Sequence, residues 1–221
     1  ELSIKNMDSC TVKLKADVGD NKEKKTISIN SNSEVYGPLK FEATESVKDI
    51  EIKSVNLHAL GSIESDVPVK VVTLVAQPNT AGKISNVNVS DTFTIAQTAA
   101  LELDQVSLKG ANVNLNLHTY AASNYEKPML TGTLEEPPKL ITLNKPENSN
   151  SKQPSEDDKF LLFRGTFTSC QAWVDSLDFG DTYFNAGSCD DYTELKMLEE
   201  KKSLNVLRKG KPPESNNDAI F

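Results

Sequence analysis

The chain has 221 residues, of which 37% are hydrophobic, and this size fits one or two domains with an ordinary core. Its net charge of −8 argues against nucleic-acid binding, because surfaces that bind a phosphate backbone are rich in lysine and arginine. There is no run of about 18 apolar residues, so we expect no transmembrane segment.

Alternating apolar and polar residues dominate the first two thirds of the chain and predict β-strands. The alternation is visible at residues 12–18, 27–29 and 39–43. Between residues 50 and 57 it changes parity, because Ile50 and Ile52 fall on one side of a strand and Val55 and Leu57 on the other. A strand cannot exchange its buried face without an irregularity, so we predict a bulge or turn at Lys53-Ser54.

Further strands are predicted at residues 67–75, 84–89, 93–95, 101–108 and 113–120, with Gly, Pro and Asn turn signals between them. Short strands separated by turns predict an all-β fold, specifically an antiparallel β-sandwich or a jelly-roll-like arrangement. The pattern resembles immunoglobulin-like and jelly-roll sandwiches, but no motif identifies a family.

A β-solenoid is the alternative fold, because segments 52–57, 84–89 and 103–108 share one pattern. These segments begin about 32 and then 19 residues apart, so they show no fixed period.

One predicted strand carries a row of polar residues in which Asn112, Asn114, Asn116 and His118 alternate with apolar neighbours. Such a row is either a surface for a polar ligand, such as a sugar, or the solvated side of a sheet. It contains no Trp or Tyr for stacking against a sugar ring, and this favours the second interpretation.

The polar segment 144–158 has the composition of a linker, yet the strand predicted after it is apolar on both sides. Such a strand belongs inside a core, so we predict one β-rich domain over residues 1–210 with 144–158 as a long surface loop. A helix is predicted at about 191–209, beginning with a capping box at Asp191 and Glu194. Residues 211–221 form a polar tail.

Candidate site residues lie mostly in the C-terminal third. Asp175, Asp178 and Asp181 are candidate calcium ligands in an acidic loop at 175–191; otherwise no metal or cofactor is expected. Cys170 and Cys189 are close enough in sequence to form a disulfide, which would leave Cys10 free. Asn88 begins a glycosylation sequon in a predicted strand.

The tail ends in Ile220 and Phe221, two large apolar residues after a polar stretch. The hypothesis for these residues is docking into an apolar groove on this chain or on a neighbour, supported by strand addition at a sheet edge.

No catalytic constellation is apparent: the chain has two histidines and contains neither G-x-S-x-G nor H-E-x-x-H. We therefore expect a non-catalytic structural or interaction protein, part of a larger assembly such as a virus particle or a cell surface. Its partners would be proteins or further copies of itself, and its location extracellular, on the cell surface or in a virion. The alternative function is a secreted carbohydrate-binding module or hydrolase that uses the acidic loop.

Overall fold

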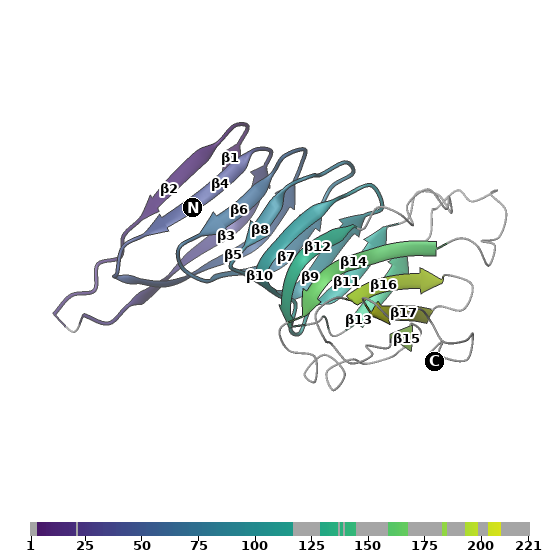
Figure 1. Ribbon diagram of the computed structural model, residues 1–221. Helices are drawn as coiled ribbons and strands as arrows, with labels where there is room; N and C mark the ends of the chain where they lie inside the picture. The colour runs from purple at the N-terminus through teal and green to yellow at the C-terminus, as the bar shows by residue number, and fades with distance from the viewer. Residues whose placement is uncertain are drawn as a thin grey trace.

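The chain is all-β in a computed structural model, and its strands form a parallel β-solenoid (Figure 1). The structure describes residues 4–20, 22–116, 129–136 and 138, together with the backbone of strands at 140–144, 159–167, 183–184, 193–198 and 203–208. Figure 1 shows the strands stacked side by side, from β1 and β2 at the N-terminal end toward β14 and β16.

Two series of parallel strands make up the solenoid, and the chain alternates between them. The first series contains β1 (Lys5–Asn6), β3 (Lys25–Val35), β5 (Val47–Leu57), β7 (Val69–Ala76), β9 (Val87–Ala96), β11 (Asn112–Asn116) and β13 (Leu140–Asn144). The second series contains β2 (Cys10–Leu14), β4 (Pro38–Ala43), β6 (Ser62–Ser65), β8 (Lys83–Ser85), β10 (Leu101–Ser107), β12 (Leu130–Glu136) and β14 (Lys159–Phe167). Each strand therefore pairs mainly with the strand two places away in the chain.

The predicted antiparallel β-sandwich is wrong, because the strands of both series pair in parallel. The fold is the solenoid that the sequence suggested only as the alternative. Alternation of apolar and polar residues reports that one side of a strand is buried, and it is the same for parallel and antiparallel neighbours. The sequence pattern was thus correct about strands and silent about their direction.

The predicted helix at about 191–209 is also contradicted, since the structure has β16 (Thr193–Leu198) and β17 (Ser203–Arg208) in that range. These two strands pair antiparallel, with Leu195 opposite Val206. β16 also pairs antiparallel with β14, and β15 (Tyr183–Phe184) pairs in parallel with β17. The apolar residues in β16 and β17 include Leu195, Met197, Leu204 and Val206, whose spacing of two is typical of a strand.

The core consists of apolar ladders in which one residue from each turn stacks on its partner in the next. In one ladder Leu57 pairs with Ala76, Ala76 with Ile95 and Ile95 with Leu115, at separations of 19, 19 and 20 residues. All four side chains are at most 1% exposed. Burial of these ladders is the main favourable contribution to the free energy of folding, because each removes apolar surface from water.

The parity change predicted at Lys53-Ser54 is confirmed. Ile52 and Val55 are both completely buried, while Lys53 and Ser54 between them point outward within one continuous strand. The ladder between β3 and β5 shifts register there, because Ile29 pairs with Ile52 but Asn32 pairs with Ser54. The irregularity lets a single strand contribute inward residues to two sides of the solenoid.

Close approach between turns requires glycine at Gly61 and Gly82. A Cβ atom on Gly82 would lie 2.0 Å from the backbone oxygen of Gly61, and one on Gly61 would lie 2.1 Å from that of Val35. Both distances are too short for any side chain, so the backbones of three successive turns approach each other at this corner.

The predicted loop at 144–158 and the predicted tail at 211–221 fall outside the described residues, apart from Asn144 at the end of β13. In the part of the chain that the structure describes, no helix has the length and hydrophobicity needed to cross a membrane.

Candidate functional site

The outward side of the first series carries an array of side chains that contains no charge. We define the uncharged face as eight residues on four consecutive strands of that series, β5, β7, β9 and β11. They form two in-register rows, Ser54, Thr73, Thr92 and Asn112 in one and Asn56, Val75, Thr94 and Asn114 in the other. The Asn112–Asn114 part of the polar row is therefore one edge of a two-dimensional surface.

These eight side chains are half-buried, because each is flanked by its neighbours in the ladder. Inward residues between them, such as Leu74, Phe93 and Val113, are at most 1% exposed. The outward position of Asn112 and Asn114 agrees with the predicted alternation, although they are less exposed than a free sheet surface would leave them.

Most polar groups on the uncharged face are available to a ligand. Within the described residues, the side chains of Ser54, Thr73, Thr94, Asn112 and Asn114 make no hydrogen bond. The other two polar residues are engaged at the margins: Thr92 donates its hydroxyl to Asp91 at 3.2 Å, and Asn56 donates its amide to Glu34 at 2.7 Å. Hydroxyl and amide groups can both donate and accept hydrogen bonds, so the face can pair with either a donor or an acceptor on a polar ligand.

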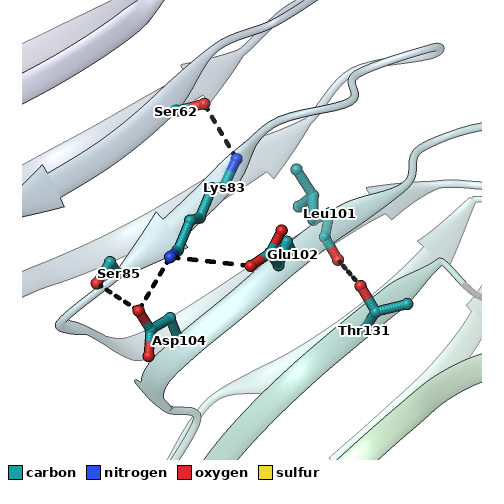
Figure 2. Close-up of polar contacts among 7 residues, drawn as sticks. All are labelled: Ser62, Lys83, Ser85, Leu101, Glu102, Asp104 and Thr131. Atoms are coloured by element: carbon teal, nitrogen blue, oxygen red, sulfur yellow. Dashed lines mark hydrogen bonds and ion pairs between the residues drawn. The ribbon is translucent and has the colours of Figure 1, made fainter.

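The outward side of the second series is charged, in contrast to the uncharged face. Figure 2 shows Lys83 of β8 extending its amine between Glu102 and Asp104 of β10. The amine lies 3.0 Å from Asp104 and 3.8 Å from Glu102, and its hydrogen bond to Asp104 raises the pKa of Lys83 above its usual value. Ser85 adds a hydrogen bond to Asp104 at 3.3 Å (Figure 2).

Such charge pairs satisfy each other across the turns and contribute little individually, because exposed ion pairs are screened by water. A pair within one strand of the same series, β4, joins Lys40 to Glu42 at 3.0 Å. Each ion pair between a lysine and an acidic residue in the described part of the chain lies outside the uncharged face. Three charged residues border the face: Lys53 and Asp91 occupy the corner next to Ser54 and Thr92, and Glu34 lies beside Asn56.

A polar cluster borders the uncharged face at its N-terminal end, where Glu34 pairs in register with Asn56. The Glu34 carboxylate accepts the amide of Asn56, and its other oxygen lies 2.7 Å from Nε2 of His58. The His58 ring stacks on Tyr36, with centroids 4.3 Å apart and planes inclined by 8°. The cluster therefore places a fixed carboxylate and two stacked rings beside the rows of hydroxyl and amide groups.

The hydrogen bond from Asn56 lowers the pKa of Glu34, with His58 contributing in the same direction against the effect of burial. A carboxyl group with a lowered pKa in the folded state stabilises the fold above its unfolded pKa, and this contribution is lost as the pH falls. Glu34→Gln should therefore reduce stability by at most about 1 kcal/mol at pH 7 and flatten its decline below about pH 4.5. Urea unfolding between pH 7 and pH 3 measures both effects.

Glu51→Gln is the matched control for this prediction, because Glu51 lies on the same series and meets the Lys70 amine at 3.3 Å on the exposed surface. It should keep the wild-type decline in stability at low pH. An unchanged pH dependence in Glu34→Gln would mean that the cluster does not favour the ionised carboxylate.

Most of the site residues predicted from sequence lie outside the described residues. These are the calcium candidates Asp175, Asp178 and Asp181, the disulfide candidates Cys170 and Cys189, and the docking candidates Ile220 and Phe221.

Besides the Asn112–Asn114 row, two residues singled out in the sequence lie in the solenoid. Asn88, the glycosylation candidate, is exposed on β9 and pairs in register with Lys70. Cys10 is a half-exposed free thiol on β2.

No set of three or more His, Cys, Asp or Glu side chains in the described ranges is grouped to hold a metal ion. The uncharged face could be found only in part from sequence, because parity placed Asn112 and Asn114 outward but did not show their neighbours. Thr92 and Thr94 become adjacent to them only through the parallel register between β9 and β11.

Comparison of the chain with protein-family models, with curated proteins and with solved structures gives no match.

Proposed function

We propose that the protein is a non-catalytic interaction protein that works through the outer surface of its solenoid as a component of a larger assembly. The observation that supports this function most directly is the separation of charge on that surface. Charged residues make up 25% of the chain, yet eight outward positions on four consecutive strands carry none. A rigid ladder that presents an uncharged, partly unpaired polar array is suited to binding an extended partner.

The solenoid gives this surface its rigidity. Every residue of the uncharged face alternates with buried residues or lies beside them, so its backbone position is fixed by the core ladders. Binding then orders few flexible groups, and a pre-organised surface loses less entropy on association than a loop does.

The alternative function, a carbohydrate-binding module or hydrolase that uses the acidic loop at 175–191, depends on residues outside the described part of the chain. No observation on the solenoid favours a hydrolase. Non-catalytic binding by the uncharged face is therefore the function that we propose.

The test compares the same substitution on two sides of the solenoid. Asn114→Asp places a carboxylate in the uncharged face, and Asn88→Asp places one beside Lys70 on an exposed part of β9. The readout is retention of the fluorescently labelled chain, produced without glycosylation, on cells and extracellular material of the source organism. We expect Asn114→Asp to lower retention at least about tenfold, which corresponds to 1.4 kcal/mol of binding free energy, and Asn88→Asp to leave it unchanged.

Equal retention of the two variants and the wild-type chain would contradict a role for the uncharged face. The same conclusion would follow if the wild-type chain showed no retention above that of an unrelated protein of equal charge.

A further inference from the structure

We propose that the ligand of the uncharged face is a neutral polysaccharide whose chain lies across successive turns of the solenoid. This inference rests on the proposed function and adds the chemical class of the ligand. It is carried by the charge, the hydrogen-bonding groups and the spacing of the eight residues.

The absence of charge selects against ionic ligands. An anionic polymer would gain affinity from lysine or arginine on the face, and a cationic segment would gain it from Asp or Glu. The solenoid has both kinds of side chain but places them elsewhere, as in the Lys83–Asp104 pair of the second series. An uncharged ligand needs no ionic contact, so it loses nothing when the charged side chains lie elsewhere.

The side chains of the face also differ from those of a typical protein interface. Stable protein interfaces are centred on aromatic, Met or Arg side chains that become desolvated. Here the only apolar member is Val75, and the rest are Ser, Thr and Asn. Seven small hydroxyl and amide side chains match the hydroxyl groups of sugar rings, which need a donor or an acceptor at each position.

The spacing of the rows suits a repeating ligand. Parallel strands lie about 4.8 Å apart, so each row presents a hydroxyl or amide at that interval over four turns, interrupted by Val75 in one row. This interval is comparable with the length of one ring in an extended chain of sugars. Individual contacts on such a surface are weak, but several linked sugar units bind together, and the combined affinity exceeds that of each unit.

The polar cluster at the N-terminal end supplies a carboxylate and aromatic rings, which the two rows lack. Asn56 pairs in register with Glu34, whose carboxylate can accept hydrogen bonds from two neighbouring sugar hydroxyls. Tyr36 and His58 lie next to it as a stacked pair of rings, and aromatic rings bind the apolar faces of sugars. A polysaccharide that follows the rows would meet this cluster at the end of its path.

The experiment measures retention of the full chain on insoluble cellulose, chitin, β-1,3-glucan and mannan, with calcium alginate gel as the anionic comparison. We expect retention on at least one neutral polymer and none above background on alginate. Asn114→Asp and Thr94→Ala should each weaken that retention, Asn114→Asp by at least about tenfold. Asn88→Asp is the matched control and should bind as the wild-type chain does.

Thermal unfolding of each variant is measured in parallel, so that a loss of retention is attributed to the face only where the melting temperature is unchanged. Retention on alginate alone, or neutral retention that Asn114→Asp leaves intact, would overturn the inference. So would a lack of retention on all four neutral polymers.

A wild-type chain that binds no polysaccharide but shows Asn114→Asp-sensitive retention on cell material would point to a protein partner. In that case the proposed function stands and the polysaccharide is excluded. Concentration-dependent self-association that Asn114→Asp abolishes would instead assign the face to a second copy of the chain, and it would overturn the inference in the same way.

Discussion

Leu115→Asp should destabilise the protein by at least about 4 kcal/mol, because it places a carboxylate in the core without a partner. Leu115 is completely buried, and in its ladder it lies between Ile95 of β9 and Leu143 of β13. Since a domain of this kind has only about 5–15 kcal/mol of stability, the loss should be visible as a large fall in the urea midpoint.

Asn114→Asp is the control for this prediction, one residue earlier on the same strand. Asn114 is half-buried on the outer side, so its carboxylate remains in contact with water and the change should stay within about 0.5 kcal/mol. A similar loss in both variants would mean that β11 does not present alternate residues to the core and to solvent.

The positions of buried residues could be predicted from sequence wherever the alternation was clear. Val113 and Leu115 are buried and Asn112 and Asn114 point outward, and the parity change at Lys53-Ser54 is a real irregularity of β5. These predictions succeed because the side-chain period of a strand depends only on the local chain.

The sequence favoured the sandwich over the solenoid because the turns of the solenoid differ in length. Ile84 pairs with Leu103, 19 residues later, so the similar segments 84–89 and 103–108 lie on consecutive turns. Segment 52–57 pairs with residues 71–76 instead, and segment 84–89, 32 residues after it, begins in β8 of the other series and ends in β9. Toward the N-terminus the separation rises to 24 between Leu39 and Ile63 and to 29 between Cys10 and Leu39, so a search for one fixed period fails.

The missed strands β16 and β17 show the limit of local signals near the C-terminus. Asp191 and Glu194 satisfied the capping pattern of a helix, and the basic residues toward its end agreed with the helix dipole. Pairing with β14 provides hydrogen bonds to β16 along its length, and local propensity is routinely overridden by such tertiary pairing.

Local sequence signals could not reveal the uncharged face either, because only the register between strands brings its residues together. On the linear sequence, Thr73, Thr92 and Asn112 are three unrelated polar residues 19 and 20 positions apart. Stacking brings them into one row and keeps the lysines and carboxylates of neighbouring strands out of it. A binding surface of this type has no short motif, and only the turn lengths determine which residues it contains.

Phe93→Ala should cost about 3–5 kcal/mol, since it removes the large side chain from a fully packed ladder and leaves a cavity. Phe93 is completely buried and pairs with Leu74 on one side and Val113 on the other, so both neighbouring turns lose contacts. In a solenoid each turn contacts only its neighbours, and stability is approximately a sum over turns and their interfaces. Hydrogen exchange should therefore show the largest loss of amide protection in β7, β9 and β11.

Phe93→Leu separates the effect of the cavity from any requirement for an aromatic ring, and it should cost less than about 1.5 kcal/mol. Phe41→Ala provides the positional comparison, because Phe41 is equally buried but lies on β4, near the N-terminal end of the stack. Its loss of protection should be greatest in β2, β4 and β6, the strands that pair around it. If both alanine variants lost protection uniformly along the chain, the turns would unfold as one cooperative unit and the stability could not be divided among their interfaces.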